Sequence, residues 1–208
     1  MVTDPPFFDN VYYSQLAGFF YYWLNQLLDI SIKMTTRDPA EVQDTDSVLF
    51  AKKLTSVFDE CNRVLRDNGL FIFTYHHSRH EGWVSVHKEI RYAGFVCIQT
   101  YSIKAEMSVS MPLQQAKTPI HIDLVIVCKK RQLSESKLIE GNIIRNAVAT
   151  ASGKIEELGN YVDISFGDAK VALIGRLLCE LSLIGELDRE LGFLEESEGS
   201  IESYSKTL

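Results

Sequence analysis

The chain has 208 residues, 46% of them hydrophobic, and a net charge of −7. This length is enough to bury a core, and the composition is that of a soluble globular protein, not of a disordered, collagen-like or low-complexity chain. The acidic balance argues against a free-standing nucleic-acid binder, because such a protein neutralises phosphates with lysine and arginine.

Signals for metal binding, export and membrane insertion are missing from the sequence. The four cysteines lie far apart without a C-x-x-C pair, which predicts core thiols and neither a zinc site nor a disulfide framework: Cys61, Cys97, Cys128 and Cys179. The first residues contain no basic and apolar export signal. The most apolar window, 171–184, contains charged residues and is shorter than the roughly 20 residues that cross a bilayer. We therefore expect a cytoplasmic protein with no metal and no membrane contact.

The first half of the sequence alternates predicted helices and strands. Residues 11–28 are densely aromatic, with apolar positions at helical spacing, and this pattern predicts a helix buried on most sides. After a polar connection, Asp46 or Ser47 is expected to cap a second helix that ends near Leu65. The apolar run at 70–75 predicts a strand buried on both faces of a parallel sheet.

Three further elements complete the predicted sheet. A helix over 80–93, which Gly94 ends, is followed by a strand over 95–103. The αβαβ alternation predicts an α/β fold with a doubly wound sheet. A last strand is expected at 120–127, and it should pair antiparallel with its predecessor because no helix is predicted between them.

The C-terminal third is predicted to be helical. Residues 134–158 and 168–194 have leucine-rich faces and acidic faces, and we interpret them as a helical extension that packs within the chain or forms an interface. The Glu/Ser-rich end, 195–208, is predicted to be a disordered tail. The expected organisation is therefore a first part at 1–132, a helical extension at 133–194 and the tail.

The stretch T-D-P-P-F-F-D-N at residues 3–10 carries the candidate chemistry. It resembles motif IV, [D/N/S]-P-P-[Y/F/W], of the S-adenosylmethionine-dependent methyltransferases that modify exocyclic amino groups of bases. Such an amine is a poor nucleophile, since its lone pair is delocalised into the ring. In this interpretation the Asp4 carboxylate and the main-chain carbonyl of Pro5 each accept one N–H, which aims the nitrogen at the methyl donor. Pro5 and Pro6 keep that carbonyl in one direction, and Phe7 offers a face to a base that has left its stack.

The same tetrapeptide also fits the start of a helix, with Asp4 as N-cap and Pro5 at the first helical position. A longer resemblance favours the methyltransferase interpretation. Over most of residues 1–132 the chain is similar to the adenine-specific DNA methylases that contain D-P-P-[YF]-[YF]-D-N-V-x-Y-[SA]-x-L-x-x-F-F-Y-x-W-L. The similar segments here read DPPFFDNVYYSQLAGFFYYWL, VLRDNGLFIFTYHH, EGWV, AGFV and LVIVCKKR.

The resemblance implies a Rossmann-like methyltransferase sheet of which only part is present. Asp4 would end one central strand, residues 70–75 would form the next strand, and the last two strands would be the C-terminal antiparallel hairpin of that class. Binding sites in such sheets lie at the carboxyl ends of strands, where Asp4, Phe7, His76 and His77 would then lie.

The resemblance also implies a cofactor and a nucleic-acid partner. The methyl donor is S-adenosylmethionine, whose sulfonium cation is favoured by aromatic faces, and the residues expected beside it are Asp4, Phe8 and Tyr12. The partner is DNA or, alternatively, RNA, and the residues expected to contact it are Phe7, Asn10, Lys129, Lys130 and Arg131. Two further basic residues, Arg79 and Lys104, are candidates for phosphate contacts.

The donor-binding element of this family is missing from the sequence. It is a Gly-rich turn that belongs before the D-P-P motif, and the 12 glycines of this chain include no G-x-G. We therefore expect the C-terminal portion of an amino-methyltransferase that is inactive alone, with an open parallel strand edge that favours self-association or a second chain carrying the donor-binding half. The target is adenine first, with cytosine or an RNA guanine as alternatives. The alternative from another class is a non-catalytic, degenerate interaction module.

Overall fold

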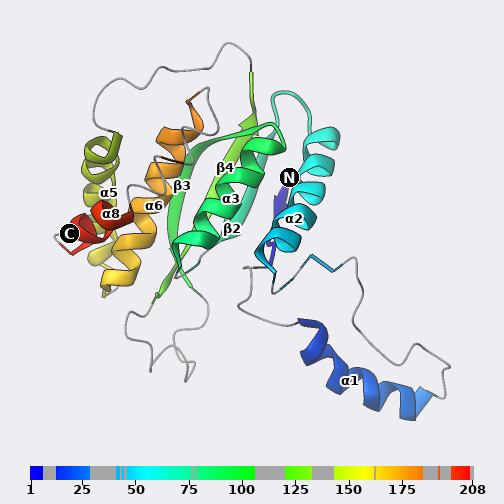
Figure 1. Ribbon diagram of the computed structural model, residues 1–208. Coiled ribbons are helices and arrows are strands. Elements are labelled where there is room, and N and C mark those ends of the chain that lie inside the picture. Colours follow the sequence, from blue (N-terminus) through cyan, green and yellow to red (C-terminus); the bar gives the residue numbers. More distant parts are fainter. Residues whose placement is uncertain are drawn as a thin grey trace.

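A computed structural model describes residues 1–6, 13–28, 41–42, 44, 46–75, 77, 79–105, 120–132, 143–161, 163–184, 192 and 198–206. The fold is α/β, with one mixed four-stranded sheet and helices packed beside it (Figure 1). The elements in chain order are β1 (Val2–Thr3), α1 (Tyr13–Leu28), α2 (Ser47–Val64), β2 (Leu70–Tyr75), α3 (His80–Tyr92), β3 (Phe95–Lys104), β4 (Ile122–Lys130), α5 (Ile143–Gly159), α6 (Phe166–Ser182) and α8 (Glu198–Ser205). Among these residues no helix is long and apolar enough to cross a bilayer.

The strands follow the order β1-β2-β4-β3 across the sheet. β1 pairs parallel with β2, whereas β4 runs antiparallel to both β2 and β3. Three strands therefore point the same way, and β4 is inserted between two of them in the opposite direction. The predicted antiparallel pairing of the last two strands is confirmed.

Local sequence signals set the helix boundaries as expected. The side chain of Asp46 accepts hydrogen bonds from the main-chain N–H groups of Val48 and Leu49, at 2.8 and 3.0 Å, and caps the start of α2. Gly94 follows α3 with φ of 73°, a left-handed conformation that favours glycine, and it turns the chain into β3. The predicted helix starting at Asp46 and the stop at Gly94 are confirmed.

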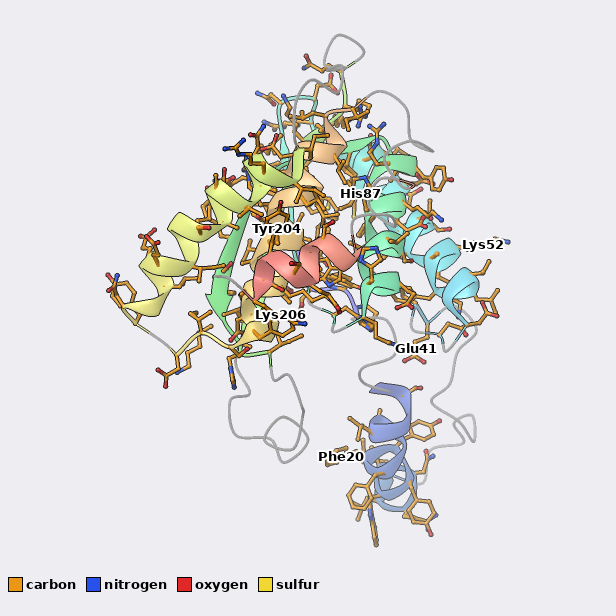
Figure 2. The ribbon with its side chains drawn as sticks, turned by 60° about the vertical axis from the view of Figure 1, so that its left-hand side comes forward. Phe20, Glu41, Lys52, His87, Tyr204 and Lys206 are labelled. Atoms are coloured by element: carbon orange, nitrogen blue, oxygen red, sulfur yellow. The ribbon has the colours of Figure 1, made fainter. Side chains whose placement is uncertain are left out.

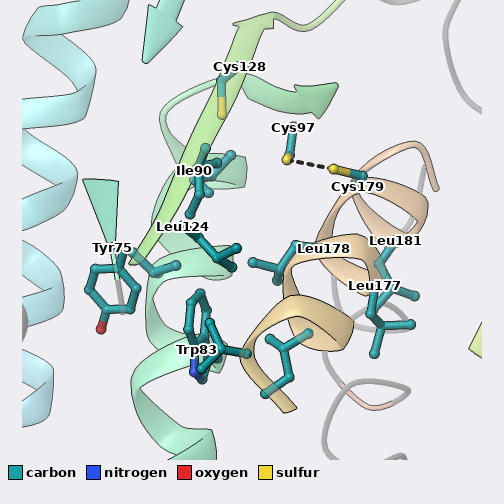
Figure 3. Close-up of a cluster of buried hydrophobic side chains, with 14 of the residues drawn as sticks. Tyr75, Trp83, Ile90, Cys97, Leu124, Cys128, Leu177, Leu178, Cys179 and Leu181 are labelled. Atoms are coloured by element: carbon teal, nitrogen blue, oxygen red, sulfur yellow. Dashed lines mark hydrogen bonds between the residues drawn. The ribbon is translucent and has the colours of Figure 1, made fainter. Parts of the chain in front are cut away.

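The core lies on one face of the sheet. Cross-strand partners share a face, so Phe71, Phe73 and Tyr75 of β2 lie on the same side as Cys128, Ile126 and Leu124 of β4. Three helices cover this side. Phe58 of α2 packs on the β2 phenylalanines, and Trp83 of α3 packs edge-on against Tyr75 (Figure 3). α6 comes so close to the sheet at Gly175 that a Cβ on this residue would lie 2.5 Å from Leu124 Cδ1. We call this side of the sheet the helical face.

The opposite face of the sheet is only partly covered. Leu70, Tyr101 and Ile103 are exposed there, and Ile72 and Thr74 are half-buried. The doubly wound arrangement expected from the αβαβ order is therefore not seen among the described elements, because α2, α3 and α6 all lie on the helical face. Parallel strands are normally covered on both faces, so this open face is unusual for such a sheet.

The two edges of the sheet differ. At the β3 edge, the Ser182 hydroxyl of α6 accepts from the N–H of Cys97 and donates to its carbonyl, at 2.9 and 3.0 Å, and Lys154 of α5 donates to the carbonyl of Thr100 at 2.7 Å. A register shift between Cys97 and Gln99 bends this edge further. At the β1 edge, no described element pairs with the outer side of the strand, and Val2 is exposed. The sheet is thus protected at β3 and open at β1.

The expectation for residues 11–28 is wrong about burial. α1 forms, but its large apolar side chains are exposed: Leu16, Phe19, Phe20, Tyr22, Trp23, Leu24, Leu27 and Leu28. Figure 1 shows α1 apart from the sheet and its helices. The aromatic residues of this helix are therefore not part of the core of this chain.

The described part of the expected helical extension packs within the chain, one of the two alternatives, because Leu173, Ile174 and Leu178 of α6 are fully buried in the main core. The expectation of a disordered tail needs correction, since α8 forms and buries Ile201 against the same core. Acidic and serine residues are typical of a solvated tail, but the apolar Ile201 anchors this segment.

Three of the four cysteines are buried, as expected for core thiols. Cys97 Sγ and Cys179 Sγ are 3.1 Å apart. The hydrogen bond with Cys128, together with burial, raises the pKa of the Cys97 thiol, and the hydrogen bond with Cys97 raises the pKa of Cys179. Both groups are therefore held as unreactive thiols.

Candidate functional site

Asp4 lies where β1 ends. The register places Thr3 beside Phe73, so Asp4 follows at the level of Thr74, whose hydroxyl donates a hydrogen bond to Asp4 Oδ1. Residues 4–6 are not helical. The alternative in which Asp4 caps a helix is therefore wrong, and its exposed carboxylate is held at the carboxyl edge of two parallel strands.

The rest of the motif is described only in part. Pro5 is buried and Pro6 is half-buried, directly after Asp4. The predictions for Phe7, Phe8, Asn10 and Tyr12 fall outside the described residues, as does that for His76. The structure therefore places the carboxylate and the prolines of the predicted site and leaves its aromatic residues as predictions.

His77 has a structural role in the turn after β2. Its ring Nδ1 accepts a hydrogen bond from the N–H of Arg79 at 3.1 Å, and its carbonyl accepts one from Trp83 Nε1 at 2.8 Å. A Cβ at Gly82 would lie 2.6 Å from the His77 ring, so the helix packs directly on the imidazole. His77 is therefore buried in the turn that follows β2.

The basic cluster predicted to contact nucleic acid lies at the other end of the sheet. Because β4 runs antiparallel to β2, Lys129 pairs with Leu70, the first residue of β2, and the length of a strand, roughly 15–20 Å, separates the cluster from the Asp4 end. Lys130 Nζ lies 3.3 Å from Asp67 Oδ1. The Arg131 guanidinium donates to the carbonyls of Ser182 and Ile184 and caps the end of α6. The structure therefore does not bring Lys129, Lys130 and Arg131 together with Asp4.

Two other basic residues do lie at the edge that carries Asp4. Arg79 follows the carboxyl end of β2, and Lys104 ends β3, which points in the same direction as β1. Both side chains are exposed. Strand direction decides which basic residues lie near the site, and it could not be read from the basic run itself.

A buried carboxylate that sequence reasoning missed ties α6 to this edge. Asp168 Oδ1 accepts from the N–H groups of His121 and Ile122, at 2.6 and 3.1 Å, and its Oδ2 lies 3.2 Å from His121 Nδ1 and accepts from Ser165 N–H at 2.9 Å. The Ser165 hydroxyl in turn accepts from Asp168 N–H, which completes a capping box. The S-x-x-D spacing at 165–168 is a sequence signal for the start of α6. No local signal links Asp168 to His121, which lies 47 residues away in the sequence.

An apolar pocket of about 580 Å³ lies on the flank of α2 beside β1. Its walls are Met1, Val42, Lys53, Ser56, Val57, Glu60, Cys61 and Val64. The opposite flank of α2 faces α3, where Asn62 donates to the carbonyl of Ala93 at 2.9 Å. The pocket lies along the open edge of the sheet and not at the Asp4 carboxylate. We call it the flank pocket.

No group of His, Cys, Asp and Glu among the described residues is arranged to hold a metal ion. Compared with models of protein families, with curated proteins and with solved structures, the chain gives no significant match. Three features of the chain bear on function: the D-P-P motif, the edge of the sheet that carries Asp4, and the flank pocket.

Proposed function

We propose that this chain is the target-base half of an S-adenosylmethionine-dependent DNA amino-methyltransferase, with adenine as the preferred base, in the cytoplasm. The observation that carries the proposal is Asp4, held by Thr74 at the carboxyl edge of parallel strands and followed by two prolines. Ligands of open α/β sheets bind at this edge. The strand order, with an antiparallel strand inserted next to parallel ones, also agrees with a partial Rossmann-like methyltransferase sheet.

In the proposed reaction, the residues of this chain orient the base. Asp4 accepts one N–H of the exocyclic amine and the carbonyl of Pro5 accepts the other, so the nitrogen lone pair points out of the ring plane towards the donor. The hydrogen bond from Thr74 fixes the rotamer of the carboxylate and leaves its second oxygen for the amine. Phe7 stacks on the extruded base, and Arg79 and Lys104 are placed to meet the phosphates.

The residues described here do not fit the methyl donor. The flank pocket is apolar and away from Asp4, and the sequence contains no Gly-rich turn for an adenosyl group. Donor binding is therefore assigned to a second polypeptide segment, and no step of the reaction is derived from this chain for it.

The geometry of the β1 edge supports such a completing segment. The carbonyl of Met1 accepts from Ile72 N–H at 3.0 Å, and main-chain groups alternate in direction along a strand, so those of Val2 point outward. A strand of the completing half can therefore pair with β1 at this edge. The flank pocket lies beside the edge and offers that half an apolar wall formed by Val57, Cys61 and Val64.

The proposal is tested by methylation of DNA with this chain completed by a donor-binding half that carries a G-x-G turn. Asp4→Ala is expected to abolish methyl transfer without changing assembly on size-exclusion chromatography, whereas Lys129→Ala, at the far end of the sheet, is expected to leave transfer intact. Unchanged activity of Asp4→Ala would remove the carboxylate from the mechanism. Ribosomal RNA offered in place of DNA distinguishes the guanine alternative.

Donor binding by the chain alone is tested separately by calorimetric titration with S-adenosylmethionine. We expect no binding in the micromolar range, and a micromolar Kd would contradict the assignment of the donor site to a second segment. The missing Gly-rich turn also favours one other function, a non-catalytic interaction module. That function predicts assembly with the completing half and no dependence of any activity on Asp4.

A further inference from the structure

α1 carries a seam of four exposed apolar residues. Leu16, Phe20, Trp23 and Leu27 are 61, 66, 54 and 78% exposed, and their spacing of four, three and four residues is that of the a and d positions of a coiled coil. Figure 1 shows α1 apart from the sheet, and Figure 2 shows Phe20 on this helix away from the rest of the fold. Nothing in the described body of the chain covers the seam.

The chemistry of α1 limits what can cover this seam. The helix sequence, YSQLAGFFYYWLNQLL, contains no charged residue. A helix that is apolar on most sides is normally buried, and helices that lie on membranes carry lysine or arginine on the polar face. The seam therefore fits an uncharged protein surface and not a nucleic-acid backbone or a lipid headgroup layer.

We propose that α1 pairs with α1 of a second copy of this chain, antiparallel and about a two-fold axis. In this arrangement Leu16 meets Leu27 of the partner copy and Phe20 meets its Trp23, so leucine packs on leucine and ring on ring. A two-fold interface requires a self-complementary patch, and this seam is symmetric about its centre. In coiled coils, charged residues at the e and g positions beside the seam select the partner helix. α1 has no charged residue, so no such pairs favour a different partner.

The surface available is sufficient for a dimer. Phe20 and Trp23 are 66 and 54% exposed, and an aromatic side chain buries about 150–250 Å² in full, so the four rings of the pair contribute about 350–600 Å². The four leucines, with the exposed Phe19 and Leu24 beside the seam, bring the interface towards about 1,200 Å², the lower end of specific protein interfaces. The proposed interface uses no residue of β1 or of the flank pocket, so it is independent of the proposed methyltransferase.

Sedimentation velocity of the full chain tests the pairing. We expect a dimer at about 10 μM that becomes a monomer in Phe20→Glu or Trp23→Glu, because the carboxylate would be buried against an aromatic ring of the partner copy. Tyr22→Glu is the matched control, because Tyr22 is an aromatic residue that is 60% exposed on another side of α1, and the same charge there should leave the dimer intact. Leu27→Gln is a milder variant near the end of the seam, expected to weaken the dimer about tenfold, and circular dichroism checks that each variant keeps its helices.

Tryptophan fluorescence gives a second readout. The chain has two tryptophans, and Trp83 is fully buried in the core, so a change on dilution reports Trp23. We expect a red shift on dilution of the natural sequence and none in Phe20→Glu. A monomeric natural chain, a dimer that survives both glutamate variants, or binding of the monomer to lipid vesicles would each overturn the proposal. None of these results depends on methyl transfer.

Discussion

Replacing Glu89 by glutamine is expected to stabilise the protein at pH 8 and to leave its stability unchanged near pH 4.5. Glu89 lies on α3, is 3% exposed, and its Oε2 has no hydrogen-bond partner among the described residues. Burial raises the pKa of this carboxyl from 4.5 to about 7; Lys88 on the same helix lowers it, and Asp59 on α2 raises it. The folded protein therefore keeps a proton that the unfolded chain has already lost.

The magnitude follows from proton linkage. Between pH 4.5 and about 7 the folded state binds more protons than the unfolded state, so the free energy of unfolding falls as the pH rises through this range. A difference of about 2.5 pKa values at about 1.36 kcal/mol each gives a loss of up to about 3 kcal/mol above pH 7. Glutamine keeps the shape of the side chain and cannot ionise, so Glu89→Gln escapes this loss.

Urea unfolding at several values between pH 4.5 and 8 measures the effect. The difference in the free energy of unfolding between Glu89→Gln and the natural chain should grow with pH and level off above pH 7. Titrating groups that the two proteins share cancel in this difference. Glu156→Gln, at an exposed position on α5, is the control for the loss of one carboxylate from the chain. Parallel profiles for Glu89→Gln and the natural chain would refute the reasoning.

Three further changes test the packing and caps described above. Gly175→Ala places a Cβ 2.5 Å from Leu124 Cδ1 and should lower the free energy of unfolding in urea by about 1–3 kcal/mol. Gly153→Ala on α5 is the control: a Cβ there meets nothing within 4 Å, so this change should stabilise the protein by about 0.5–1 kcal/mol. Equal effects of the two changes would contradict the close approach of α6 to the sheet. Asp46→Ala removes two cap hydrogen bonds and should cost about 1 kcal/mol, with Asp46→Asn close to neutral. Asp168→Ala leaves the N–H groups of His121 and Ile122 without their acceptor and should cost about 3 kcal/mol, and thermal melting with no loss would contradict its role.

Much of the helix and strand pattern could be predicted because local signals set it. The cap at Asp46 and the left-handed Gly94 each depend on residues within a few positions. The antiparallel pairing of the last strands also followed from the short distance between them in the sequence. Such short-range features are readable without knowledge of the rest of the fold.

The errors concern what is covered and which way an element points. An apolar helix such as α1 is expected to be buried, but its sequence does not say by which molecule. The basic run ending at Arg131 lies at the end of the sheet away from Asp4, because β4 runs antiparallel to β2. The direction of β4 depends on the whole sheet, so the basic residues alone do not show which end they occupy. The tie between His121 and Asp168 joins residues 47 apart, and no local pattern pairs them. The carboxylate of Asp4 could be proposed from the sequence alone because its motif is contiguous.

The unequal edges of the sheet limit how far strand pairing can extend between molecules. At the β3 edge, Ser182 and Lys154 occupy main-chain groups that an incoming strand would need. Each molecule therefore accepts a strand on one side only. Two molecules could pair through their β1 edges, but the pair would then have no open sheet edge left. A fibril that grows by edge-to-edge addition of strands therefore stops at two molecules.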